Sequence, residues 1–416
     1  MSDDEVDLEL LDLLRKSLGT GNGHSSRQPA ETKVLESARY IFDNAIDVAL
    51  SAFGTKKAAG IIWHLMNGKE YSTKTWSQHE LHPKSKDMSA VNFILTMDLL
   101  NFSFWSDDPD QSRQFAVEYN GKQWTGYWGL VAALHRALEE EIPITTPDFW
   151  LNKDEFTEDV LRHIFRSATD AEIPLFHERL QCLREAGQVL DEKFGGNFAN
   201  CIYDADHSAA ALVNLLAENF ASFQDEATFE GRRVRFYKRA QILVADLWAC
   251  FEGKDYGEFH DIDKITMFAD YRIPQMLHQL GCMLYSPPLD SHIRQLKQIK
   301  SKSTWEIELR GASIWCIELI RQEIERRYLN SNDAKMPGLN NNSDADGVHD
   351  EDLNRCRTKE EAEMATKKED QNSDSKSTKP HVNAILIDFF LYDTVKQLEQ
   401  DGREMIPHHR TRSIWY

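Results

Sequence analysis

The sequence predicts a mainly α-helical protein with one small β-hairpin. Through most of the chain, apolar residues recur three or four positions apart, the spacing of one face of a helix. In one segment, apolar and polar residues alternate on both sides of a pair of residues that favours a tight turn, which indicates a hairpin. Elsewhere the predicted strands do not alternate with helices as they do in proteins with a parallel sheet. A nucleotide-binding fold built on a parallel sheet is therefore not expected.

Three apolar stripes predict helices. Residues 130–138 carry one, and residues 175–183 begin a second, which is expected to end at Gly195 and Gly196 because glycine commonly closes a helix. The third covers residues 234–253.

The predicted hairpin comprises residues 115–119 and 122–125, which flank Asn120 and Gly121. Asn-Gly is a pair that two-residue hairpin turns favour, because both residues tolerate positive φ.

The composition predicts a single helical domain interrupted by polar segments. The 416 residues are 41% hydrophobic and 10% aromatic, enough for a substantial core. Residues 1–30 are expected to be a disordered tail, and the polar residues 331–380 a disordered insertion. Residues 381–416 are apolar and aromatic again, so they are expected to complete the domain formed by residues 31–330.

Charge, cysteines and the start of the chain bear on partners and location. The 68 acidic residues outnumber the 48 basic ones, which gives a net charge of -20 and disfavours stable nucleic-acid binding, although one local phosphate site is still allowed.

The six cysteines lack any spacing suited to zinc, so reduced thiols and no metal site are expected. The acidic start and the lack of a long apolar run predict a cytoplasmic protein without a membrane partner, the nucleus being the alternative.

Asp270 is the first candidate for chemistry. Apolar residues at helical spacing from Ile273 to Leu284 follow it, with Pro274 in the first turn, so Asp270 is expected at a helix N-cap. A cap alone explains an aspartate there. The same free N–H groups also hold a carboxylate ionised, and an ionised carboxylate stabilises an oxocarbenium-like transition state.

Lys238 lies beside the apolar stripe of residues 234–253. We expect the stem of Lys238 to cover apolar surface while its amine reaches water, because buried lysines are rare.

Asp388 and Asp393 lie in a markedly apolar run and flank Phe389. Either a structural salt bridge or a ligand that is cationic or donates hydrogen bonds satisfies such acids, and both interpretations stay open.

Weaker signals come from His79, from Asp98 and from the aromatic cluster of residues 101–105. The aromatic residues are suited to stacking on a base, but a place in the core is the simpler interpretation.

At these residues the chain closely resembles the queuosine salvage proteins, known as queuosine 5'-phosphate N-glycosylases. The matching stretches are residues 79–83, 98–105, 126–128, 141–144, 193–196, 236–246, 265–272 and 385–388. Their occurrence together in one order makes the match specific.

The resemblance implies a helical fold similar to the helix-hairpin-helix DNA glycosylases, and hydrolysis that frees the base queuine without a cofactor. It implies that Asp270 is the catalytic carboxylate, with Lys238 and Arg272 as candidates for orienting it or for binding the 5'-phosphate. The residues that it implies for queuine binding are His79, Phe268, Asp388, Phe389 and Asp393. Two departures stand out: Phe389 replaces a frequent tyrosine, and the insertion is not a known family feature.

Queuine is a 7-deazaguanine, so the base has no N7 that could be protonated before it departs. Catalysis therefore has to stabilise the sugar cation. Electrostatic stabilisation, activation of water and covalent attack by Asp270 all remain open. One alternative function is a non-catalytic protein that binds or delivers queuine. The other is a nucleic-acid glycosylase, which the net charge of -20 disfavours.

Overall fold

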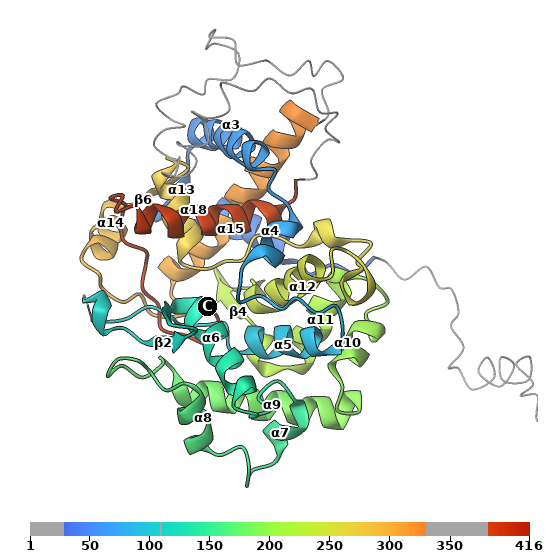
Figure 1. Cartoon of the computed structure of the whole chain (residues 1–416). Coiled ribbons are helices and arrows are strands. Elements are labelled where there is room, and N and C mark those ends of the chain that lie inside the picture. The colour runs from blue at the N-terminus through green and yellow to red at the C-terminus, as the bar shows by residue number, and fades with distance from the viewer. Residues whose placement is uncertain (1–28, 109, 330–381) are drawn as a thin grey trace, which may run out of the picture. The chain divides into compact units, whose positions relative to one another are not determined.

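Helices dominate the computed structural model, which describes residues 29–108, 110–329 and 382–416 (Figure 1). The predicted insertion, and nearly all of the predicted tail, lie outside the described residues. The α-helices in chain order are α2 (Val34–Asn44), α3 (Ala52–Lys69), α4 (Thr73–Gln78), α5 (Met88–Leu99), α6 (Gly126–Glu139), α7 (Pro147–Leu151), α8 (Glu158–Ile164), α9 (Phe176–Phe194), α10 (Phe198–Asp204), α11 (Ala209–Asn219), α12 (Lys238–Cys250), α13 (Arg272–Gln279), α14 (Pro287–Arg294), α15 (Thr304–Ile324) and α18 (Ala384–Gln400).

The described strands form three antiparallel pairs: β1 (Val48–Leu50) with β6 (Met283–Tyr285), β2 (Ala116–Tyr119) with β3 (Lys122–Thr125), and β4 (Glu226–Phe229) with β5 (Arg232–Arg235). The mainly α prediction is thus confirmed.

The predicted hairpin is confirmed as β2 and β3, joined by Asn120 and Gly121 at φ values of 51° and 71°. Glu230 and Gly231 make a second turn of this kind between β4 and β5, at 46° and 74°. Sequence analysis missed it because glutamate is not a favoured residue at positive φ.

Helix boundaries correct three details of the sequence analysis. The predicted helices of residues 130–138 and 175–183 form as α6 and α9, but Leu138 is 38% exposed instead of belonging to the core. The third helix begins at Lys238, because Val234 pairs in β5. Leu284 does not continue α13: it lies in β6 opposite Ala49 and is 52% exposed.

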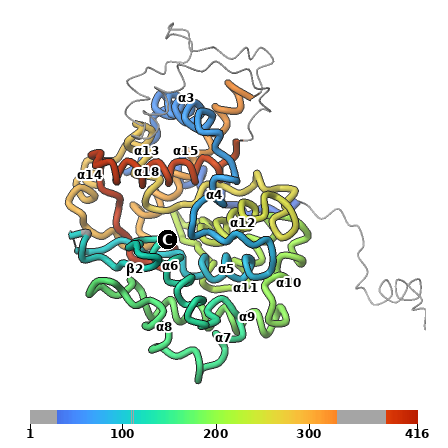
Figure 2. The backbone as a smooth tube through the Cα atoms, viewed as in Figure 1, coloured from blue at the N-terminus to red at the C-terminus, as the bar shows by residue number. Residues whose placement is uncertain are grey.

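Two groups of helices position the candidate residues. In one, α15 packs against α2, α3, α13 and α18 (Figure 1). In the other, α12 packs against α4, α5 and α11. After α18 the chain runs back as an extended segment to residues 103–105, where Ser103 N donates to Tyr416 O (Figure 2).

Five cysteines fall within the described residues, and all five are buried and outside any disulfide. No described helix is both long and apolar enough to cross a membrane. No group of three or more described His, Cys, Asp or Glu residues is arranged to hold a metal ion.

Candidate active site

The loop before α13 places Asp270 at the positive end of that helix. Its Oδ1 accepts the backbone N–H of Arg272 at 2.8 Å and that of Ile273 at 2.9 Å. The helix begins at Arg272, and Asp270 performs the capping that the sequence predicts even though Tyr271 stands between them. Burial raises the pKa of Asp270, and the charge of Lys238 and these two N–H groups act in the opposite direction.

Lys238 is buried, with only 6% of the residue exposed, so the interpretation of a stem that leads its amine to water is wrong. It is the first residue of α12, and its backbone N–H donates to Asp225 Oδ2 at 3.2 Å. Burial lowers the pKa of its ammonium, whereas the negative charges of Asp270, Asp388 and Asp98 act to raise it. The charges of several carboxylates thus act on the lysine, which forms no ion pair within 4 Å among the described residues.

Asp388, on α18, is bound to the loop that carries Asp270. Its Oδ2 accepts the backbone N–H of Phe268 at 3.0 Å. Asp388 is 5% exposed, and burial raises its pKa well above the usual range, with a further contribution from the charge of Asp270. The neighbouring Phe389 is half-buried, with its ring centroid 5.8 Å from that of Phe268.

Asp393 lies one turn further along α18. The hydroxyl of Tyr71 donates to its Oδ2 at 2.6 Å. Solvent reaches this carboxylate, yet desolvation by the atoms crowded around it raises its pKa. No described cation forms an ion pair with either Asp388 or Asp393 within 4 Å. The charge of Lys238 acts on Asp388, and that of Lys69 on Asp393, without a described ion pair of this length.

Arg272 forms an ion pair with Glu399 and donates to Gln275 Oε1 at 3.2 Å. Burial acts to lower its pKa, but the charge and hydrogen bond of Glu399, together with Tyr271 and Tyr392, outweigh this effect, so the pKa is raised. Lys396, one turn before the end of α18, lies 3.5 Å from Glu399. Burial lowers the pKa of Lys396 to about 8, and the charge of Asp270 opposes the shift. Two cations thus lie near Asp270 on the side of α18.

His79 belongs to a separate wall of aromatic rings. It stacks on Trp128, with centroids 3.3 Å apart and planes 12° apart. Its Nδ1 accepts the N–H of Leu81 at 3.2 Å, so the proton of the neutral ring lies on Nε2. Burial lowers the pKa of His79 to about 4, which keeps the ring neutral at physiological pH. The described contacts of His79 do not reach the acids of α18.

Contacts and electrostatic interactions link seven of the eight residues that the resemblance implies, and no described contact links His79 to them. Sequence analysis missed Tyr71 and Lys396. Lys396 could have been found from helical spacing, because it lies three residues after Asp393 on α18. Tyr71 carries no such signal, since it reaches Asp393 across 322 positions of the chain.

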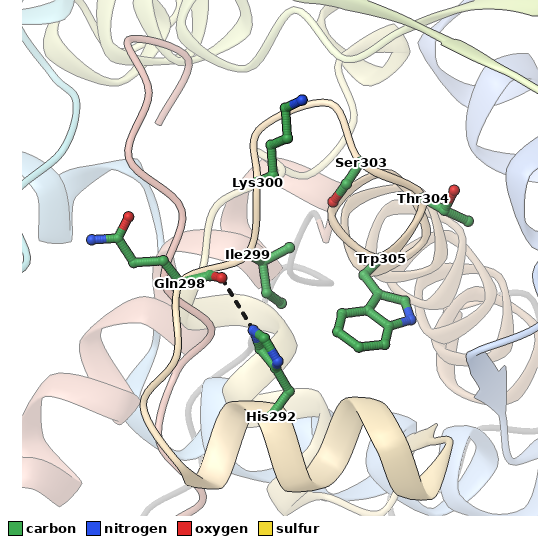
Figure 3. A pocket seen from close by; sticks show the side chains of 7 residues that line it. All are labelled: His292, Gln298, Ile299, Lys300, Ser303, Thr304 and Trp305. Atoms are coloured by element: carbon green, nitrogen blue, oxygen red, sulfur yellow. Dashed lines mark hydrogen bonds between the residues drawn. The ribbon is translucent and has the colours of Figure 1, made fainter.

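Two cavities lie elsewhere. One of about 320 Å³ is lined by residues from α14 to the start of α15, including His292 and Trp305 (Figure 3). Another of about 690 Å³ lies between residues 86–88 and residues 202–207. Neither contains a residue of the candidate site.

Comparisons with known proteins identify relatives of this chain. Residues 81–416 match the family model described as queuosine salvage protein. A protein of Bos taurus named queuosine 5'-phosphate N-glycosylase/hydrolase is 39% identical over 382 residues, which cover 92% of this chain and 98% of that protein. A protein of the same name from Nematostella vectensis is 38% identical over 381 residues, covering 92% and 97%. One from Sphaerobacter thermophilus is 42% identical over 259 residues, covering 62% and 77%. The chain therefore belongs to the queuosine salvage protein family.

Proposed function

We propose that this chain hydrolyses the N-glycosidic bond of queuosine 5'-phosphate and releases queuine. The observation that carries the proposal is the carboxylate of Asp270, held by two backbone N–H groups beside a buried lysine. The names of the relatives support the same reaction.

The leaving group determines where catalysis has to act. A 7-deazaguanine has no N7 to protonate, so the bond breaks with positive charge developing on the ribose. Asp270 then stabilises the sugar cation with its negative charge. Because the two N–H groups and the helix end are already oriented, little reorganisation is required in the transition state.

The base is bound by α18 and the loop before α13. The rings of Phe268 and Phe389 supply apolar walls, and Asp388 and Asp393 accept hydrogen bonds from the guanine-like edge or pair with the amine of queuine. Buried or crowded acids that form no described ion pair within 4 Å are suited to this role, because the ligand supplies further hydrogen-bond donors. His79 contributes a neutral ring, and its Nε2 proton takes no part in the hydrogen bond with Leu81.

The 5'-phosphate is bound by Lys396 together with Arg272. Lys396 is partly exposed and remains mostly protonated below pH 8. A Lys396→Met variant should raise KM for queuosine 5'-phosphate much more than for the nucleoside queuosine. Lys74→Met, an exposed lysine on α4, is the matched control. Equal effects on both substrates would assign the phosphate elsewhere.

The activity itself is tested by incubating the protein with queuosine 5'-phosphate and detecting free queuine by mass spectrometry. A protein that only binds or delivers queuine would bind the base and release none from the nucleotide. Release from intact tRNA instead would indicate a nucleic-acid glycosylase.

A further inference from the structure

One arginine on α15 is buried against the loop that carries Asp270. Arg310 is 2% exposed, and its Nε donates to the carbonyl oxygen of Ala269 at 3.1 Å. Its Nη1 donates to Asp225 Oδ1 at 2.9 Å and to Glu306 Oε1 at 3.3 Å, and its Nη2 donates to Asp225 Oδ2. The guanidinium therefore holds two buried acids and one backbone carbonyl group at the same time.

The carbonyl group of Ala269 belongs to the peptide bond that leads into Asp270. Because a peptide bond is planar, the direction of this carbonyl sets the plane from which the backbone of Asp270 begins. The backbone turns tightly there, since Asp270 N donates to Phe268 O at 2.7 Å. Beyond Asp270, the first two N–H groups of α13 hold its carboxylate. The loop is thus held before Asp270 by Arg310 and after it by the helix.

Asp225 extends this contact to the start of α12. Its Oδ2 accepts the backbone N–H of Lys238 at 3.2 Å. Its carbonyl oxygen accepts the N–H groups of Phe236 at 3.0 Å and Tyr237 at 3.3 Å. Tyr237 has a φ of 50°, which is uncommon for a residue other than glycine and persists only where the surroundings support it. The ion pair of Arg310 and Asp225 therefore joins the backbone of Lys238 to the backbone next to Asp270.

Aromatic rings keep the guanidinium of Arg310 in place. Its Cζ lies 4.0 Å from the ring centroid of Phe236 and 4.6 Å from that of Tyr416. The planar guanidinium directs donors toward both acids and the carbonyl group in one fixed arrangement. The single ammonium of a lysine has no such fork. The contacts therefore depend on an arginine and not only on a positive charge.

We propose that Arg310 is a positioning residue for the hydrolysis. Through Ala269 it fixes the backbone of Asp270, and through Asp225 it fixes the first residue of α12. An oriented charge stabilises a transition state well only if it is in place beforehand, and a displacement of about 1 Å can lower the rate about 100-fold. The inference rests on the proposed function, because Asp270 is taken as the stabilising carboxylate.

Arg310→Lys tests the proposal, because it keeps a positive charge for the two acids but loses the planar fork. In the folded variant, kcat for queuosine 5'-phosphate should fall about tenfold or more, since Asp270 is no longer held in one place. The Kd for queuine should change less than about threefold, because Asp388 still holds the N–H of Phe268. Turnover by mass spectrometry, calorimetry and a melting curve measure the three quantities.

Arg179→Lys is the matched control. Arg179 on α9 is fully buried, donates to the carbonyl groups of Leu100 and Phe102, and lies 4.3 Å from the ring centroid of Phe102. It resembles Arg310 in burial and in its partners, but no described contact of Arg179 reaches the candidate site. Arg179→Lys should therefore lower the melting temperature and leave kcat of the folded protein unchanged.

Hydrogen exchange tests the link between the two segments without substrate. In Arg310→Lys, the amide hydrogens of residues 236–240 and of residues 268–273 should both exchange faster than in the wild type. In Arg179→Lys, both segments should exchange as in the wild type. Asp225→Asn should have the same effects as Arg310→Lys, and it serves if that variant does not fold, because Glu306 remains as an acidic partner of Arg310.

A kcat within about threefold of the wild type in the folded Arg310→Lys protein would overturn the proposal. An equal loss of kcat in Arg179→Lys, or unchanged exchange in the two segments, would overturn it as well. Absence of queuine release by the wild type would count against the proposed function. The exchange measurement would then still decide whether Arg310 links the two segments.

Discussion

The role proposed for Asp270 requires an ionised carboxylate in surroundings that favour its protonated form. Burial raises its pKa, and three groups oppose the shift: Lys238 and the backbone N–H groups of Arg272 and Ile273. These groups are fixed by α12 and by the first turn of α13, so they act before substrate arrives. At the scale of single residues, the site is therefore a balance between desolvation and oriented positive charge.

Replacing Asp270 with asparagine tests that balance. Asparagine also caps helices well but carries no charge, so we expect the fold and queuine binding to persist. The value of kcat should fall about 100-fold or more, as when an oriented electrostatic group is removed. Turnover by mass spectrometry, with a melting curve alongside, measures both. More than about a tenth of wild-type turnover in the folded variant would exclude the role of Asp270.

Asp393 gives a second prediction at this scale. Asp393→Asn keeps an acceptor for Tyr71 but loses the charge. Hydrogen bonds to charged groups contribute about 1.5–3 kcal/mol, so queuine binding should weaken about tenfold or more. The melting temperature should not fall, because the raised pKa of Asp393 shows that the ionised form is not favoured in the empty site.

A queuine analogue without the cyclopentenyl amine identifies the partner of Asp393. If the amine is the partner, the analogue should bind more weakly than queuine to the wild type and equally well to the variant. Additive losses, measured by calorimetry, would instead assign Asp393 to the guanine-like edge.

At the scale of elements, α15 is the helix against which α2, α3, α13 and α18 pack. Its approach to α2 depends on Gly311, where an added Cβ would lie 2.5 Å from the side chain of Ile41. Ile41 is fully buried and cannot move aside freely. The close contact therefore fixes how deeply α2 settles on α15.

We expect Gly311→Ala to lower the free energy of unfolding by about 1–3 kcal/mol, the usual cost of overpacking. Gly68→Ala is the control, because that position on α3 has no atom within 4 Å of an added Cβ. It should raise stability by about 0.4–1 kcal/mol. Urea unfolding measures both. Equal stability of the two variants would show that α2 and α15 adapt to the extra methyl group.

At the scale of the whole molecule, charge determines which partners are attracted. The net charge of -20 repels a polyanion, while the proposed phosphate site places Lys396 and Arg272 together, both paired with Glu399. The proposal therefore favours a mononucleotide over tRNA as the substrate.

We therefore predict no gel shift of tRNA at micromolar protein, even at about 50 mM salt, where phosphate contacts are strongest. A basic protein of similar size serves as the positive control. A shift that disappears as salt increases would reveal a cationic surface that recognises the nucleic-acid backbone.

The sequence by itself determined features that depend on residues close together in the chain. The hairpin at Asn120 and Gly121, the closure of α9 at Gly195, and the capping by Asp270 each follow from bonds within a few residues. Apolar periodicity likewise decides which face of a helix is buried. The family resemblance also came from short stretches, whereas the likeness to helix-hairpin-helix glycosylases stays a prediction.

The tertiary structure decided which of those faces meet. The sequence indicated a solvent-reaching Lys238, and the packing of α12 against α4 and α5 buries it instead. It could not show that Tyr71 bonds Asp393. Burial and the charges of distant neighbours determine a pKa, and both arise only when segments far apart in the chain pack together.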